Sequence, residues 1–238
     1  YPLSRAEKTL KDIQNINKET YRNYVEDKMQ HILNYHLNNN RFFKNFSGSH
    51  YSSWENLPVL TKHDLQIPLE NRLSNGYTLK NVYINKTSGS TGTPFYFAKD
   101  KFTHALTWSV IKNRFGWHNL NNEKQARFYG IPKSFITNKK ERLKDYLSNR
   151  YRFNVFDLSN SAMDKWIKEF SKTKYVYLNG YTTVILAFAK HLISKHIVLK
   201  SICPSLKACV TTSEMNFEGD KQLMEKAFGV PIINEYGA

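Results

Sequence analysis

The sequence has neither long apolar runs nor closely paired cysteines. No stretch of about 18 apolar residues occurs, so we predict no membrane-spanning helix. The first residues also lack the apolar core of a secretion signal. The chain contains only 2 cysteines, Cys203 and Cys209, and their spacing fits neither a redox pair nor a zinc site. We therefore expect two reduced thiols in or near a strand, in a reducing compartment such as the cytoplasm.

A recognisable metal-ligand spacing is also missing. The chain has 8 histidines, and the pairs His31/His36 and His191/His196 do not have the i, i+4 spacing that places two ligands on one helix face. We therefore expect no metal site built from histidines and cysteines.

Acidic residues are scarce. Asp and Glu total 20 against 35 Lys and Arg, so the net charge is +15, which suits nucleic acid, anionic membranes or polyphosphates. The cations are scattered along the chain, and a solvated surface explains most of them. Trp108, Trp117, Tyr146 and Tyr151 lie among basic residues and could stack on bases, although ordinary packing is the favoured interpretation. A basic nucleic-acid-binding module remains an alternative, but no recognition helix or RNA-binding signature supports it.

The hydrophobic pattern predicts alternating strands and helices in most of the chain. The predicted strands are residues 82–84, 95–98, 127–131, 153–156, 175–178, 206–210 and 231–236. The predicted helices are 8–38, 102–110 after an Asp100 cap, 138–150, 161–170 with a Ser161 cap, 184–192 and 216–229. This alternation predicts an α/β fold with a largely parallel sheet, whose sites lie at the carboxyl ends of strands. Polar clusters follow several of these strands and are expected to converge there.

The strongest local signal is the segment Thr87-Ser88-Gly89-Ser90-Thr91-Gly92-Thr93-Pro94 between two predicted strands. Its glycines permit close backbone approach to a ligand, and its hydroxyls supply hydrogen-bond donors without bulk. It is not a Walker loop, because no lysine follows the second glycine, and the dinucleotide fingerprint is absent too. From composition alone, a mobile hairpin loop is an equally good interpretation.

This segment resembles the phosphate-binding signature of adenylate-forming enzymes, the group that includes acyl-CoA synthetases. Further similarities point to the phenylacetate–CoA ligase branch, and within it to the CapK-type group associated with capsular polysaccharide biosynthesis. They are Leu60-Thr61-Lys62-x-Asp64-Leu65, Asn179-Gly180-Tyr181, Thr211-Thr212-Ser213-Glu214 and Glu235-Tyr236-Gly237-Ala238.

The resemblance implies the large N-terminal domain of an ATP-dependent, AMP-forming ligase. In the implied reaction a small-molecule carboxylate attacks ATP, and the acyl group then passes to CoA or to another thiol or amine. Thr87, Ser88, Gly89, Ser90, Thr91, Gly92 and Thr93 would hold the phosphates. Ser213, Glu214, Tyr236 and Gly237 would border the adenine or ribose. Tyr129, Gly130, Gly180 and Tyr181 would bound the acyl pocket.

The sequence also departs from the family pattern. The family's Mg²⁺-holding glutamate would stand two residues after Ala238, so we expect ATP and Mg²⁺ as cofactors of the parent enzyme but no metal site and no activity in these residues alone. Thr93 replaces a lysine that many relatives carry. We expect residues 1–78 to be a helical segment packed on the core, residues 79–238 to be a truncated nucleotide-binding core, and the small C-terminal domain to be absent. A non-catalytic relative that acts as a binding scaffold is the remaining alternative.

Overall fold

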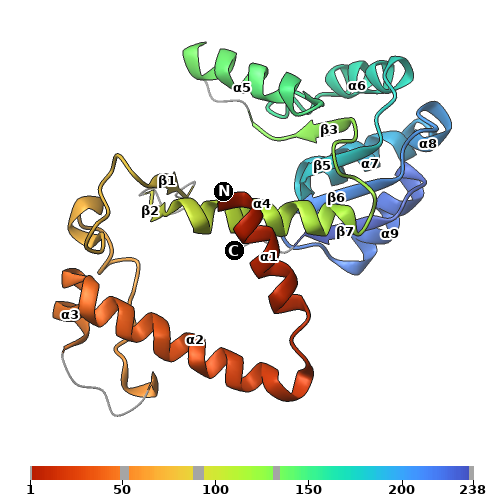
Figure 1. The fold of residues 1–238 in the computed structure, drawn as a ribbon. Coiled ribbons are helices and arrows are strands. Elements are labelled where there is room, and N and C mark those ends of the chain that lie inside the picture. Colours follow the sequence, from red (N-terminus) through yellow and green to blue (C-terminus); the bar gives the residue numbers. More distant parts are fainter. Residues whose placement is uncertain (1, 49–53, 88–93, 131–134, 236–238) are drawn as a thin grey trace. The chain divides into compact units, whose positions relative to one another are not determined.

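The computed structural model describes residues 2–48, 54–87, 94–130 and 135–235 (Figure 1). The chain divides into two compact units, Tyr1–Arg114 and Phe115–Ala238. This boundary differs from the division at residue 78 expected from the sequence, because the hairpin and most of the helix that follows belong to the first unit.

The first unit is built from helices and one two-stranded antiparallel sheet. Its helices are α1 (Pro2–Gln14), α2 (Lys18–Asn39), α3 (Arg41–Ser47) and α4 (Lys101–Gly116), which continues into the second unit, and its short 3-10 turns are η1 (Trp54–Asn56) and η2 (Leu69–Arg72). Strands β1 (Tyr83–Lys86) and β2 (Tyr96–Lys99) form the hairpin. Lys112 pairs with Glu7 at 3.1 Å, and Gln14 donates to Asn113 at 3.0 Å, so polar contacts join α1 to α4.

The helix predicted over residues 8–38 is wrong in its limits, because the structure has two helices there. Asn17 caps α2 by accepting a hydrogen bond from the Thr20 N–H at 2.9 Å, which starts a new helix and ends the continuity with α1. Asn40 likewise caps α3, and its side-chain amide donates to the carbonyl of Arg72 at 2.9 Å. The predicted Asp100 cap is confirmed, since its carboxylate accepts from the Thr103 N–H at 2.6 Å.

The second unit contains a five-stranded sheet in which all neighbours are parallel, in the order β4-β3-β5-β6-β7. Its strands are β3 (Gln125–Phe128), β4 (Arg150–Arg152), β5 (Tyr177–Tyr181), β6 (Ala208–Thr212) and β7 (Ile232–Glu235). Its helices are α5 (Phe135–Leu147), α6 (Asn160–Lys172), α7 (Thr182–Ser194), α8 (Leu199–Ile202) and α9 (Glu218–Phe228). The predicted α/β class with a parallel sheet is therefore confirmed.

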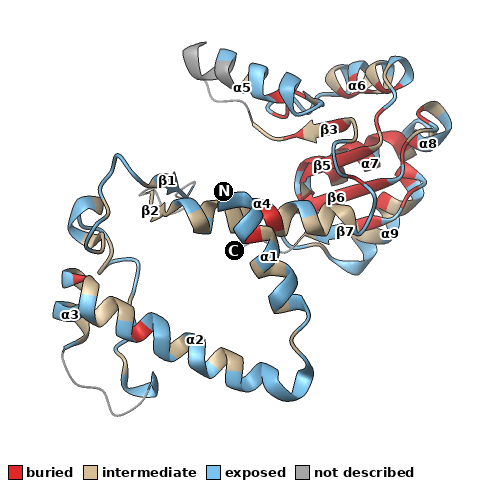
Figure 2. Cartoon of the chain, viewed as in Figure 1, coloured by how far each residue is buried: buried red, intermediate tan, exposed pale blue. Residues whose placement is uncertain are grey.

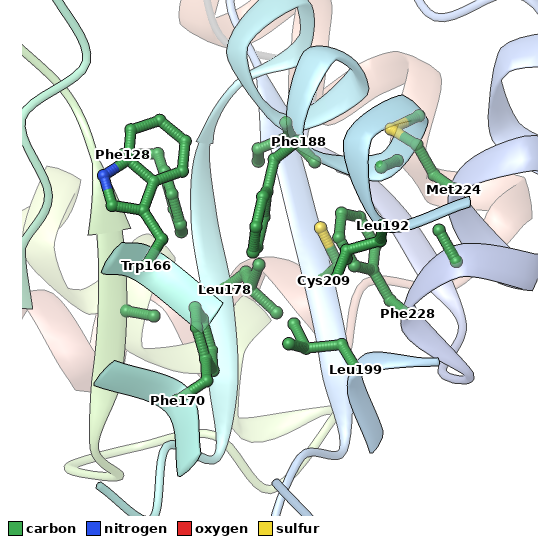
Figure 3. Close-up of a cluster of buried hydrophobic side chains, with 14 of the residues drawn as sticks. Phe128, Trp166, Phe170, Leu178, Phe188, Leu192, Leu199, Cys209, Met224 and Phe228 are labelled. Carbon is green, nitrogen blue, oxygen red and sulfur yellow. The ribbon is translucent and has the colours of Figure 1, made fainter. Parts of the chain in front are cut away.

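The hydrophobic core lies between one face of this sheet and the helices α6, α7 and α9 (Figures 2 and 3). Phe128 and Leu178 come from the strands, and Trp166, Phe170 and Phe188 come from the helices. The rings of Phe128 and Phe188 lie 5.9 Å apart, within the range of favourable aromatic contacts. Both cysteines are free and buried, as expected, and burial raises the pKa of the Cys209 thiol.

Two further predictions in this unit need correction. The strand expected at 153–156 lies earlier, at β4, while Phe153 and Val155 enter the core from the segment after the strand, which explains the misleading apolar pattern. The cap of α6 is Ser159 rather than Ser161, because the Ser159 hydroxyl accepts from the Ala162 N–H at 3.3 Å. The predicted stop of α9 at Gly229 is confirmed, with φ 69° in the left-handed region.

Candidate functional site

The ends of the Ser/Thr/Gly segment are fastened together at Thr87. Its N–H donates to the carbonyl of Phe95 at 3.0 Å, and its hydroxyl oxygen accepts from the Phe95 N–H at 3.1 Å. Thr87 therefore closes the base of the segment, a role that composition did not reveal. Ser88, Gly89, Ser90, Thr91, Gly92 and Thr93 lie outside the described residues, and their role as phosphate ligands stays a prediction.

The carboxyl ends of four strands in the second unit lie side by side. Phe128 pairs with Gly180, Gly180 pairs with Thr211, and Thr212 pairs with Glu235. Because these strands are parallel, the residues that follow them emerge at one edge of the sheet. That edge carries the sequence-predicted Tyr129, Gly130, Tyr181, Ser213 and Glu214. Tyr236 and Gly237 follow β7 directly but lie outside the described residues.

Two tyrosines form an aromatic wall at this edge. The rings of Tyr129 and Tyr181 have centroids 4.8 Å apart, and the Arg127 guanidinium carbon lies 4.2 Å from the Tyr129 ring centroid. Burial raises the pKa of Tyr129 to about 12, so its phenol stays protonated at neutral pH. The wall therefore combines apolar ring surface with a hydroxyl that can donate a hydrogen bond.

Gly180 has a structural reason for being glycine. A Cβ atom added there would lie 2.5 Å from both Cβ and the carbonyl oxygen of Phe128, so the close approach of β3 and β5 requires the missing side chain. A Cβ atom added at Gly130 would lie 2.8 Å from the Cζ atom of the Phe156 ring. Packing accounts for Gly180, whereas the exposed Phe156 ring at Gly130 could turn away. The part of both glycines in an acyl pocket stays a prediction.

Glu214 is held at the start of α7. Its carboxylate accepts from the Thr183 N–H at 2.6 Å and from the Thr183 hydroxyl at 3.1 Å, which satisfies a free donor of the helix N-terminus. The preceding Ser213 is exposed and has φ 69°, a left-handed conformation that a serine rarely adopts. The turn after β6 therefore has a left-handed residue at Ser213, and its Glu214 caps the start of α7.

Sequence reasoning missed a polar stripe on the face of the sheet opposite the main core. The Gln125 side-chain amide donates to Asn179 at 2.9 Å, and Asn179 donates to the carbonyl of Val210 at 3.4 Å, all in buried surroundings. Nε of Arg127 is buried without a hydrogen-bond partner among the described residues. Burial, followed by the neighbouring Arg150, lowers the pKa of Arg127. Polar residues at every second position of β3 were the available signal.

Two expected absences can be compared with the described part of the chain. Within it, no group of three or more histidine, cysteine, aspartate or glutamate residues is placed to hold a metal ion. No helix in the same residues combines the length and the hydropathy needed to cross a bilayer.

The four aromatic residues expected to serve ordinary packing are all exposed. Two of them still have ring contacts, Tyr151 with Phe153 and Tyr175, and Trp108 with His104. Trp108 is 54% exposed, Trp117 66%, Tyr146 81% and Tyr151 46%. A single sequence cannot distinguish such positions from core aromatics, because exposure depends on which face of the element the fold covers.

No protein-family model matches this sequence, and no curated protein matches it. Solved structures do match. An open conformation of 2-hydroxyisobutyryl-CoA ligase in complex with 2-HIB-AMP and CoA superposes with a TM-score of 0.63 at 13% identity, over 92% of this chain and 50% of that chain. The same ligase in the postadenylation state with 2-HIB-AMP gives 0.61 at 12% identity, over 94% of this chain and 50% of that one.

The likeness to these structures establishes the fold. The chain has the fold of part of an adenylate-forming ligase and spans about half the length of the ligase structures it matches.

Proposed function

We propose that this chain is the ATP-binding part of an AMP-forming carboxylate ligase. The observation that carries the proposal is the gathering of Tyr129, Tyr181, Ser213 and Glu214 at the carboxyl edge of one parallel sheet. The family resemblance assigns the two tyrosines to the acyl pocket and Ser213 and Glu214 to the border of the adenine or ribose. The shared fold supports the proposal, because the matching ligase structures hold 2-HIB-AMP and CoA.

In this proposal the segment after Thr87 grips the β- and γ-phosphates. Successive N–H and hydroxyl groups bind an anion without needing a lysine. Each hydrogen bond to a charged group contributes about 1.5–3 kcal/mol. Thr87 lowers the ordering cost by closing the base of the segment.

The carboxyl edge would hold the rest of the reactants. The turn at Ser213 and Glu214, with Tyr236, would border the adenosine, and the ring wall of Tyr129 and Tyr181 would border the acyl group. The substrate carboxylate attacks the α-phosphorus of ATP. The bond between the α-phosphorus and the oxygen that bridges to the β-phosphate breaks, and pyrophosphate leaves. The acyl-AMP then passes its acyl group to the sulfur of CoA, or to another thiol or amine, and AMP leaves with the former carboxylate oxygen.

In the described part of the chain, no group of three or more histidine, cysteine, aspartate or glutamate residues is placed to hold a metal ion. The chain's own contribution is to position the phosphates and the adenosine.

The finer assignment to the phenylacetate–CoA ligase branch and its CapK-type group also belongs to this proposal, as does a cytoplasmic role in capsular polysaccharide biosynthesis. Its support is the family-like segment Leu60–Leu65. There the Thr61 N–H donates to the Asp64 carboxylate at 2.8 Å, so the segment forms a defined turn.

The test is ATP binding by the 238-residue chain, measured by isothermal titration calorimetry. Thr87→Val removes the oxygen that accepts from the Phe95 N–H and should weaken ATP binding about tenfold, or about 1.4 kcal/mol. Thr87→Ser keeps that oxygen and should bind nearly as well as the parent chain. Ser90→Ala with Thr91→Ala should also weaken binding at least about tenfold. Equal affinity in all of these variants would exclude the assigned role of the segment.

A nucleic-acid-binding function is the second candidate, and the exposure of Trp108, Trp117, Tyr146 and Tyr151 favours it. Exposed aromatic rings among cations are typical of single-strand binding surfaces. This function requires affinity for an oligonucleotide that falls steeply with salt concentration. Fluorescence anisotropy of a labelled single strand at several salt concentrations distinguishes it from the ligase proposal.

A further inference from the structure

Helix α5 contacts strand β4 through charges rather than through apolar side chains. The Asp145 carboxylate has a side-chain exposure of only 8% and accepts from Nε of Arg150 and from Nε and Nη2 of Arg152, the last two at 2.8 and 3.0 Å. Glu141, one turn earlier, accepts from Nη2 of Arg152 at 3.1 Å. The face of α5 that meets the sheet is therefore ionic.

The apolar side chains described in the second half of α5 are exposed instead. Leu143 is 59% exposed, Tyr146 81% and Leu147 74%, at positions i, i+3 and i+4 of one helix face. This arrangement reverses the usual amphipathic pattern, in which the apolar face is buried. Ordinary packing of the second unit does not account for it.

An open cavity of about 680 Å³ lies between α5 and the amino ends of β3 and β4. Its volume falls in the range of small-ligand pockets, about 300–1,000 Å³. The cavity is partly lined by the cations Lys124, Arg142 and Arg150 and by the rings and apolar chains of Tyr146, Leu147 and Tyr151. Residues 125 and 150 pair at the start of their strands, so Lys124 and Arg150 lie toward the sheet edge opposite the candidate ligase site. Arg152, at the end of β4, also lines the cavity and donates to the carbonyl of Gly130 at 3.2 Å.

The lining carries excess positive charge. Its ionisable residues are four cations and two carboxylates, a net charge of +2. Burial opposes ionisation of Asp145, but hydrogen bonds from Arg152 and Arg150 outweigh it and hold its pKa below the usual value. The hydrogen bond from Lys144 lowers the pKa of Glu141 as well. Both carboxylates are therefore ionised at neutral pH, and the cavity lining keeps its net positive charge.

Donors in the cavity are also unused. In the described part of the chain the Lys124 ammonium has no ion-pair or hydrogen-bond partner, and the terminal guanidinium nitrogens of Arg150 make no hydrogen bond. Asp145 fixes Arg150 through Nε alone, so those two nitrogens are held in place. An anchored guanidinium and a free ammonium that line the same cavity suit a planar or tetrahedral oxyanion.

We propose that this cavity binds a small aromatic anion, with its phosphate or carboxylate group on Lys124 and Arg150 and its ring against Tyr146 and Tyr151. The exposed rings supply a stacking surface, and the two cations supply the charge complementarity. The two proposed anion ligands lie toward the opposite sheet edge from the proposed ligase site, and this proposal does not depend on that site.

The test uses 1-naphthyl phosphate and 1-naphthoate, titrated into the full chain and followed by ligand fluorescence. At least one should bind saturably at one site, and at least tenfold more tightly than 1-naphthol or inorganic phosphate. The tighter of the two identifies the acidic group. Binding of naphthol or phosphate alone with equal affinity would overturn the proposal.

Matched variants locate the site. Lys124→Gln should weaken binding at least fivefold and Tyr146→Ala at least threefold. In the part of the chain that the structure describes, neither change removes a side-chain hydrogen bond or ion pair. Lys226→Gln makes the same charge change on α9 and should leave binding unaltered. Thr87→Val should also leave it unaltered, which separates this site from the ATP site. Parent-like binding by both Lys124→Gln and Tyr146→Ala would refute the proposal.

Discussion

The two units of the chain differ in how much hydrophobic side chain they bury. In the second unit, strands and helices bury a continuous cluster that includes Phe128, Phe170 and Phe188, each no more than 1% exposed. In the described residues of the first unit, Ala6 and Leu33 are the buried hydrophobic residues (Figure 2). Its helices α2 and α3 have side-chain caps, and exposed ion pairs lie along α1 and α2. Such exposed pairs contribute little to the free energy of unfolding. The carboxyl edge with Tyr129, Tyr181 and Glu214 therefore rests on the well-buried second unit, while Thr87 and its contact with Phe95 belong to the weakly buried first unit.

The largest expected effect is on amide hydrogen exchange. Strands β5 and β6 should exchange at least about 1,000-fold more slowly than α2, which corresponds to about 4 kcal/mol in opening free energy. The reason is that opening β5 or β6 exposes the aromatic core, whereas α2 has only Leu33 buried. Exchange followed by mass spectrometry on peptides resolves the two regions. Equal protection of α2 and β5 would contradict the comparison.

A core truncation should come next. Phe188→Ala removes ring contacts to Phe128, Trp166 and Phe228 and should lower the free energy of unfolding by about 3–5 kcal/mol. Phe217→Ala removes the same atoms at a position 62% exposed and should change it by less than about 0.5 kcal/mol. Urea denaturation followed by near-UV circular dichroism measures both. Similar losses in the two variants would show that the cluster is not the stabilising element.

Asp145→Asn should destabilise by about 3 kcal/mol, because it leaves two partly buried guanidinium groups without their shared carboxylate. The native pKa of Asp145 is depressed, so its stabilising effect is present above the unfolded pKa and is lost as pH falls through the native one. Below about pH 4 the free energy of unfolding of the parent chain should therefore fall more steeply than that of Asp145→Asn, which lacks this carboxylate. Asp12→Asn, in an exposed pair with Lys8, should change little. A parallel pH dependence of stability in Asp145→Asn and the parent chain would refute this role.

The smallest expected change in the free energy of unfolding comes from replacing glycine by alanine at two positions. Gly180→Ala should destabilise by about 1–3 kcal/mol, since the new methyl group meets the backbone of Phe128. Gly219→Ala, in α9 with no atom within 4 Å of the added group, should be neutral or stabilise by up to about 1 kcal/mol. Thermal unfolding of the two variants is the measurement. Tolerance of alanine at position 180 would mean that β3 and β5 are not as close as described.

The same contrast explains which parts of the fold could be predicted. In the second unit the buried strands β5 and β6 and the glycine stop of α9 follow from apolar runs and from turn chemistry. The shift of β4 was missed because Phe153 and Val155 are buried outside a strand, which gives the same pattern as a strand would. In the first unit the break before α2 depends on one asparagine cap, and the weak apolar stripe continues across it.

The positions of several candidate residues follow from topology alone, while their roles in a site stay a prediction. Parallel strands bring their carboxyl ends together whatever the side chains, so Tyr129, Tyr181 and Ser213 share an edge as expected. The cap that Glu214 makes on α7 and the clasp between Thr87 and Phe95 were missed, because both depend on contacts between segments or on backbone geometry that a single sequence does not reveal.

Hydrogen exchange in the presence and absence of saturating ATP tests the central claim most directly. We predict slower exchange in peptides that contain residues 87–95 and 211–216, with little change in α2. The Thr87→Val variant should show a smaller effect at the same ATP concentration. Unchanged exchange in both peptides, with ATP shown to be bound elsewhere or not at all, would contradict the proposal that this chain grips a nucleotide.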